Sequence, residues 1–142
     1  MREDLADSLG IKTISDLAMH ADLRLGFTNE FMDRGDGWPG LRDRYALPPD
    51  ARGLDHDLAY RGLESGTIHA MDLYSTDAEI RYYGLRVLVD DRRYFPEYHA
   101  VILWRADLEE RAPGVVAAFR ELEEVTPDAA MVSMNARAKL DR

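Results

Sequence analysis

An α/β fold in one domain, with a mostly parallel sheet flanked by helices, is the architecture that this sequence predicts. Three observations support the prediction. Short runs of alternating apolar residues, typical of strands, occur along the chain. Segments with apolar residues at helical spacing separate these runs, and such alternation favours a parallel sheet. The 142 residues, 46% of them apolar, suffice for one buried core and contain no internal repeat or long linker.

The N-terminal part predicts two short helices followed by a strand. Residues 3–10 carry apolar side chains at helical spacing and end on a glycine, which is typical of a helix end. Thr13 or Ser15 can cap a second short helix over residues 16–20. Residues 23–27 alternate between apolar and other residues and predict the first strand.

The stretch from Gly26 to Pro39 connects this strand to a helix predicted from Trp38 to Tyr45. Ligands gather where strands of open α/β sheets end and helices begin, because free backbone N–H groups converge there. Arg34 is the single arginine of this loop, and its guanidinium can bind a carboxylate through paired N–H donors. The alternative, favoured from these residues alone, is a surface ion pair of Arg34 with Asp33 or Asp36.

The middle of the chain predicts further alternation of strands and helices. The strands are expected at residues 52–54, 67–73 and 85–89, and the helices at 58–64 and 76–83. Asp55 or Asp57 can cap the first of these helices. Thr76 and Glu79 stand three residues apart in the pattern of a capping box, which predicts the start of the second helix.

The C-terminal part predicts a loop, one more strand and two helices. Residues 90–97 are polar and contain a proline, whereas residues 98–104 are rich in aromatic and branched apolar side chains and predict a strand. Residues 113–142 are expected to form the C-terminal helices. The first follows Pro113, and the second begins at Thr126 and Pro127, because proline suits the first helical position.

Composition excludes several classes of function. The formal net charge of −9 argues against nucleic acid or an anionic membrane as a partner. The absence of cysteine excludes disulfides, thiolate metal sites and a cysteine nucleophile. No apolar run reaches the length of a membrane span, and no hydrolase nucleophile motif, phosphate-binding loop or dinucleotide fingerprint occurs. No cofactor is therefore expected.

Asp55, His56 and Asp57 leave one alternative function open, a cytosolic ligand-sensing or enzymatic α/β domain. Carboxylate and imidazole groups are good metal ligands and acid–base groups. Adjacent residues at a helix start point in different directions, however, and aspartate is favoured there by the helix dipole alone. No second cluster at ligand spacing completes a site, so the sequence predicts no metal.

Three tyrosines stand at predicted strand ends. Tyr74 closes one predicted strand, and Tyr94 and Tyr98 flank the loop before the next. In a parallel sheet these positions lie near one another, so the rings could present their electron-rich faces to one cation, with about 0.5–2 kcal/mol from each ring. The alternative, favoured when this pattern is considered alone, is that the tyrosines are amphipathic core edges with a hydrated hydroxyl.

Four segments together resemble the substrate-binding component of ABC importers for glycine betaine, choline and related osmoprotectants. They are residues 10–18, 29–41, 72–78 and 90–98, and in this order they cover nearly the whole chain. The resemblance implies a type II periplasmic-binding-protein fold, in which two α/β lobes close on a ligand. This chain is then a single lobe, the second, with its C-terminal helices, and the first lobe lies upstream.

The resemblance also implies roles for single residues. Arg34 matches the arginine that binds the ligand carboxylate, and Tyr74 matches a tyrosine of the cage around the ammonium group. A second cage ring is expected in the following loop, with Tyr98 favoured over Tyr94. Three further residues are expected to shape the pocket floor: Thr28, Asn29 and Asp77.

Partners and location follow from the same resemblance. The expected partners are a small quaternary ammonium ligand, an ABC permease and the missing first lobe, with self-association of the single lobe through its uncovered face. The parent protein is expected outside the cytoplasm. Met1 is then an internal start, which explains why no signal peptide opens the chain. The sequence leaves open whether the ligand is glycine betaine, choline, carnitine or a larger betaine.

Overall fold

The computed structural model of the protein describes residues 1–123 and 125–139. Residues 124 and 140–142, which belong to the predicted C-terminal helical region, lie outside this description. The elements in chain order are α1 (Glu3–Leu9), the 3₁₀-helix η1 (Ser15–Met19), β1 (Leu25–Thr28), α2 (Asn29–Asp33), α3 (Trp38–Tyr45), β2 (Ala51–Leu54), α4 (His56–Glu64), α5 (Glu79–Tyr82), α6 (Leu108–Arg111), α7 (Pro113–Arg120) and α8 (Asp128–Lys139).

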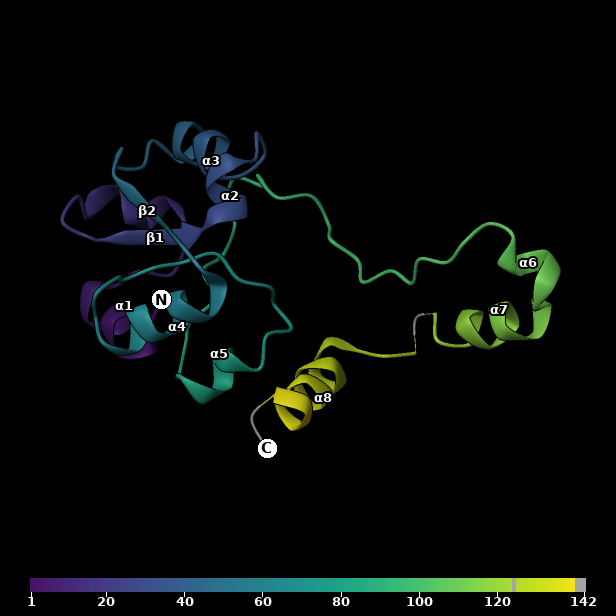
Figure 1. The fold of residues 1–142 in the computed structure, drawn as a ribbon. Helices are drawn as coiled ribbons and strands as arrows, with labels where there is room; N and C mark the ends of the chain where they lie inside the picture. The colour runs from purple at the N-terminus through teal and green to yellow at the C-terminus, as the bar shows by residue number, and fades with distance from the viewer. Residues whose placement is uncertain (124, 140–142) are drawn as a thin grey trace.

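The sheet consists of β1 and β2, which pair in parallel from Leu25 opposite Ala51 to Thr28 opposite Leu54. The predicted α/β class with a parallel sheet flanked by helices is confirmed (Figure 1). All four residues of β1 are buried, whereas β2 is partly exposed. On its other edge β1 meets Ala70, whose carbonyl accepts a hydrogen bond of 3.0 Å from the Gly26 N–H. Strand β1 is therefore the centre of the sheet.

Three predicted strands do not form within the described residues. Residues 67–73 make a single bridge through Ala70, and residues 85–89 make two isolated bridges. Residues 98–104 make none, and Leu103 within them is 89% exposed. Apolar alternation creates a strand only where a neighbouring backbone accepts and donates the ladder hydrogen bonds. These segments are extended, but the described chain offers them no continuous partner.

The predicted capping box at Thr76 is also wrong. Helix α5 begins at Glu79, after Ala78, and no side chain caps it. The Glu79 carboxylate is buried and forms an ion pair of 2.5 Å with the ammonium of Lys139. A long-range ion pair thus replaces the local capping bond. The structure adds a helix that the sequence analysis missed: α2, capped by the Thr28 hydroxyl, interrupts the predicted loop.

The core has two parts on either side of β1. The first joins α1, β1 and α3, and its aromatic centre is Phe27, whose ring centroid lies 4.9 Å from that of Trp38. The second gathers around α4 and contains the fully buried Tyr60 and Leu63. Burying each large side chain contributes about 1.5–3 kcal/mol, so these clusters are the main source of stability in the described chain.

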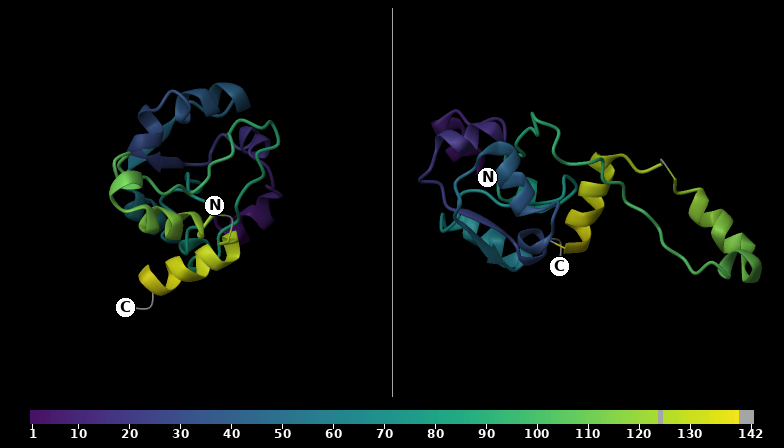
Figure 2. Two further views of the ribbon diagram at one scale, coloured as in Figure 1. Left: turned by 90° about the vertical axis from the view of Figure 1, so that its right-hand side faces the viewer. Right: turned by 90° about the horizontal axis from the view of Figure 1, so that it is seen from above.

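The C-terminal part extends away from residues 1–95, which form the sheet and most of the core and are here called the body. Residues 99–123, here called the arm, run outward and carry α6 and α7 away from the sheet, and the chain then returns so that α8 lies beside the body (Figures 1 and 2). Lys139 of α8 contacts Asp57 at 3.0 Å, and the Asn135 amide donates to the Thr76 carbonyl at 2.9 Å. None of the helices in residues 1–123 and 125–139 has the length and apolar character needed to cross a membrane.

Candidate functional site

A cavity of about 520 Å³ opens at the carboxyl end of β1. Its size lies within the range of about 300–1,000 Å³ that is usual for small-molecule sites. Apolar side chains such as Phe27, Phe31, Met71, Leu88 and Phe95 form much of its wall. The polar and aromatic polar lining residues are Thr28, Glu30, Arg34, His56, Asp72, Tyr74, Arg86 and Tyr98. Four of the seven predicted site residues therefore line one cavity: Thr28, Arg34, Tyr74 and Tyr98.

Arg34 follows α2, where a turn closed by the Gly37 N–H and the Arg34 carbonyl at 3.0 Å redirects the chain. The guanidinium donates to both carboxylate oxygens of Asp36, from Nε at 2.9 Å and from Nη2 at 2.6 Å. Nη2 also approaches the Tyr98 hydroxyl at 3.4 Å. Hydrogen bonding to Asp36 raises the pKa of Arg34 and lowers the pKa of Asp36. Arg34 therefore forms the surface ion pair with Asp36 that the sequence suggested, and it also lines the cavity.

Tyr74 and Tyr98 present accessible rings, with exposed fractions of 65% and 55%. Tyr94 does not line the cavity. Its hydroxyl donates to the Gly37 carbonyl at 3.0 Å and so connects the turn after Arg34 to the loop of residues 90–97. Burial raises the pKa of this hydroxyl. Of the two tyrosines that the sequence left as alternatives, Tyr98 lies at the cavity and Tyr94 supports the loop behind it.

Thr28 ends β1 and is held by Asp72. The Asp72 carboxylate accepts from the Thr28 backbone N–H at 2.6 Å and from its hydroxyl at 2.8 Å. The same hydroxyl accepts from the Phe31 N–H at 3.3 Å and so starts α2. Sequence reasoning did not single out Asp72. The available signal was its place two residues before Tyr74, within one of the segments that carry the resemblance.

Asn29 and Asp77 do not line the cavity. Asn29 is exposed, and its side chain lies over β2, where a Cβ on Gly53 would stand 2.6 Å from the amide oxygen. Asp77 lies behind the wall. Its carboxylate accepts from the Tyr60 hydroxyl at 2.7 Å and from the Tyr74 N–H at 3.1 Å. Asp77 therefore positions Tyr74 rather than facing the cavity itself.

Asp55, His56 and Asp57 do not gather into one site. The Asp55 carboxylate caps α4 by accepting from the Asp57 N–H at 3.1 Å. His56 reaches the cavity wall and lies 3.5 Å from the Asp77 carboxylate. The Asp57 side chain instead pairs with Lys139 of α8. Across residues 1–123 and 125–139, no group of three or more histidine, aspartate or glutamate side chains is arranged to hold a metal ion.

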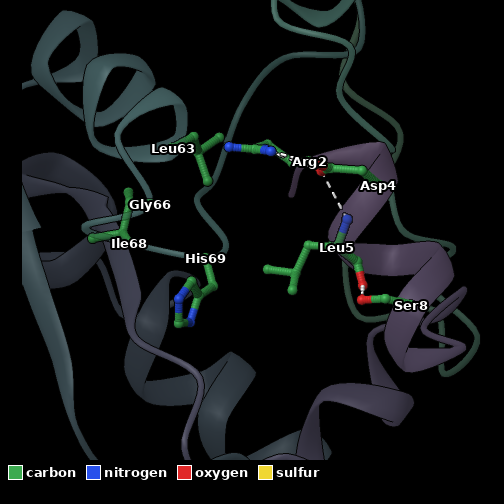
Figure 3. A pocket seen from close by; sticks show the side chains of 8 residues that line it. All are labelled: Arg2, Asp4, Leu5, Ser8, Leu63, Gly66, Ile68 and His69. Carbon is green, nitrogen blue, oxygen red and sulfur yellow. Dashed lines mark hydrogen bonds and ion pairs between the residues drawn. The ribbon is translucent and has the colours of Figure 1, made fainter.

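A second cavity, of about 430 Å³, lies between α1 and the chain that follows α4 (Figure 3). Its polar groups are already engaged. Arg2 is paired with Asp4, and His69 accepts through Nδ1 from the Arg24 N–H at 3.0 Å. None of the predicted ligand-binding residues lines it. The cavity at the end of β1 is therefore the candidate site.

The chain is similar in sequence to known binding proteins of transport systems. A sequence profile described as the substrate binding domain of ABC-type glycine betaine transport systems matches residues 1–142. The glycine-betaine-binding protein of Pseudomonas aeruginosa is 32% identical over 155 aligned residues, covering 100% of this chain and 50% of the relative. The ergothioneine transport permease/ergothioneine binding protein EgtU of Helicobacter pylori is 33% identical over 136 residues, covering 94% of this chain and 24% of the relative.

Solved structures give the same result. A crystal structure of a glycine betaine/carnitine/choline ABC transporter superposes with a TM-score of 0.77 at 31% identity, over 98% of this chain and 52% of that one. Apo YehZ from Escherichia coli superposes with a TM-score of 0.67 over 99% of this chain and 54% of that one, and at 18% identity it shows the fold alone. This chain thus spans about half of these two structures and of the Pseudomonas aeruginosa relative, and about a quarter of the Helicobacter pylori relative.

The chain is an α/β domain with a cavity of small-molecule size at the end of β1, and the family whose profile it matches consists of transporter substrate-binding domains rather than enzymes. More particularly, the chain belongs to the family of substrate-binding domains of ABC-type glycine betaine transport systems. The resemblance found from the four sequence segments is confirmed.

Proposed function

We propose that this chain supplies one half of a binding site for a quaternary ammonium osmoprotectant, such as glycine betaine or choline, in an ABC importer. One observation carries the proposal: the Arg34 guanidinium and the Tyr98 hydroxyl meet at 3.4 Å on a cavity that Tyr74 also lines. The relative named for glycine betaine and the solved structure named for glycine betaine, carnitine and choline support this ligand class.

The chemistry of the lining suits such a ligand. A trimethylammonium group donates no hydrogen bond, so it is bound through the faces of aromatic rings. Tyr74 and Tyr98 offer those faces, while Arg34 offers planar N–H donors to a ligand carboxylate. A primary ammonium would lose hydrogen bonds to water that the ring faces do not replace, and this loss favours the trimethylammonium group. Thr28 and Asp72 keep the end of β1 rigid beneath the ligand.

The other half of the site belongs to a second lobe in this proposal. The Tyr74 and Tyr98 side chains are 65% and 55% exposed, and the chain spans about half of the Pseudomonas aeruginosa relative and of the solved structure of the glycine betaine/carnitine/choline transporter. A lobe supplied by the rest of the protein would close over Tyr74 and Tyr98, exclude water and present the loaded domain to an ABC permease outside the cytoplasm. When that lobe is absent, the apolar arm favours self-association of this chain.

Calorimetric titration of the complete natural protein with glycine betaine and choline tests the proposal. Tyr74→Ala and Tyr98→Ala should each weaken both ligands by about five- to thirtyfold, the loss expected for a cation–π contact of about 1–2 kcal/mol. Tyr82→Ala is the matched control, since Tyr82 is also 65% exposed but lies outside the cavity. An unmodified protein that binds neither ligand, or cavity variants that behave like the control, would refute the proposal.

A further inference from the structure

The guanidinium of Arg34 already holds a carboxylate. Asp36, two residues further on, accepts from both Nε and Nη2 in the bidentate geometry that carboxylates prefer with arginine. The turn from Arg34 to Gly37 is tight, since a Cβ on Gly37 would stand 2.0 Å from the Phe31 carbonyl oxygen, and it keeps Asp36 near Arg34. The chain itself thus occupies one edge of the guanidinium, Nε and Nη2, to which a ligand carboxylate could otherwise bind.

The other charged side chains of the cavity do not replace the positive charge of Arg34. Arg86, the other arginine of the lining, is paired with Glu3 and with Asp7, the latter at 2.7 Å. Glu30 and Asp72 also border the cavity, and within residues 1–123 and 125–139 no cationic side chain forms an ion pair with either. With Arg34 neutralised by Asp36, the wall carries an excess of negative charge.

We propose that Asp36 is a specificity-determining residue, whose carboxylate competes with the carboxylate of a zwitterionic ligand for Arg34. The proposal rests on the function proposed above and deepens it. Asp36 weakens the binding of betaines and leaves cations without a carboxylate, such as choline, at a relative advantage. Asp36 weakens betaine binding in either of two binding modes. A ligand carboxylate that displaces Asp36 must break the Arg34–Asp36 ion pair, and one that binds beside Asp36 meets a guanidinium whose charge is already compensated.

Asp33 provides a matched control. It lies one residue before Arg34, is exposed, and makes no ion pair or hydrogen bond through its side chain to Arg34 within the described residues. Asp33→Asn removes the same charge as Asp36→Asn, from the last residue of α2, three positions earlier in the chain. Any difference between the two variants therefore reports the contact with Arg34 rather than the general field of an acidic loop.

The test measures the affinities of glycine betaine and choline by calorimetry at one ionic strength, in the complete natural protein and in the two variants. Asp36→Asn should strengthen glycine betaine by about two- to fivefold, the range of an exposed ion pair, and leave choline unchanged or weaker. Asp33→Asn should leave the ratio of the two affinities unchanged. Equal melting temperatures of the three proteins check that the fold is retained.

Each other outcome overturns the inference in a recognisable way. If the unmodified protein binds glycine betaine and Asp36→Asn binds it equally or less tightly, Asp36 orients Arg34 and does not compete, while the proposed function stands. Equal strengthening of both ligands shows a general change of the cavity. If neither the unmodified protein nor a variant binds either ligand, the proposed function fails, and the inference fails with it.

Discussion

The body, residues 1–95, buries its large apolar side chains, whereas the arm, residues 99–123, exposes most of them. In the body, two hydrophobic clusters enclose β1, and Leu63 is only 1% exposed. In the arm, Val101 and Leu103 are 71% and 89% exposed, and Val116 is the one buried hydrophobic residue among those described. The body carries its own core, whereas the arm presents an apolar surface that its own chain does not cover.

The boundary between the two regions coincides with the candidate site. Tyr98 stands immediately before the arm, and its hydroxyl meets Arg34 of the body at 3.4 Å. A ligand bound in the cavity at the end of β1 would therefore contact the junction from which the arm departs. The comparison teaches that the body positions the cavity residues and that the arm leaves the body directly after one of them, Tyr98.

The largest expected difference between the body and the arm is in their contribution to the free energy of unfolding. Leu63→Ala should lower the free energy of unfolding by about 2–5 kcal/mol, because it leaves a void in the second cluster. Leu103→Ala, the same substitution in the arm, should change it by less than about 0.5 kcal/mol. Urea denaturation followed by circular dichroism measures both. Equal losses would show that the arm is packed as tightly as the body.

The next effect concerns the junction. Arg34→Ala should weaken glycine betaine by roughly tenfold, because the ligand carboxylate loses charge-assisted hydrogen bonds, and should weaken choline much less, since choline has no carboxylate. Calorimetry with both ligands measures the difference. Arg42→Ala is the control, because Arg42 pairs with Asp43 and does not line the cavity. Equal losses for the two ligands in Arg34→Ala would remove this arginine from the carboxylate site.

Sequence reasoning predicted the helices better than the strands for a physical reason. Helices such as α3 and α7 and the capping of α4 depend on local signals: proline near the helix start or an aspartate before it. A parallel sheet, as formed by β1 and β2, was predicted because strand-like segments alternate with helical segments along the chain. The strands expected at residues 85–89 and 98–104 failed because a strand depends on a distant backbone partner, which local alternation does not encode.

The predicted site residues separate into those that line the cavity and those that do not. Arg34 and Tyr74 were singled out by a loop and a strand end and received roles from the resemblance, and the structure places them on one cavity with Thr28 and Tyr98. Asp77 was expected in the pocket floor and instead holds Tyr74 from behind. Asp72 was missed because its partner, Thr28, lies 44 residues earlier in the chain.

The smallest expected effect concerns α8, which returns from the arm to the body. Lys139 bridges Asp57 and the buried Glu79, so Lys139→Ala leaves the Glu79 carboxylate without its cation. We expect a loss of about 1 kcal/mol, at the lower end for a buried charge because the Lys139 side chain is half exposed. Chemical denaturation measures it, and Lys12→Ala, at an exposed lysine, is the control.

The pH dependence gives this contact a second, independent signature. Hydrogen bonds to Glu79 and Asp57 raise the pKa of Lys139 in the folded protein above its ordinary value of about 10.4. A raised folded-state pKa means that the contact stabilises the protein fully below the unfolded pKa and loses its effect as pH rises through the folded pKa. The difference in stability between the unmodified protein and Lys139→Ala should therefore be constant near pH 7 and shrink above about pH 10.5. A difference that stays constant to pH 12 would show that α8 is held by packing rather than by this ion pair.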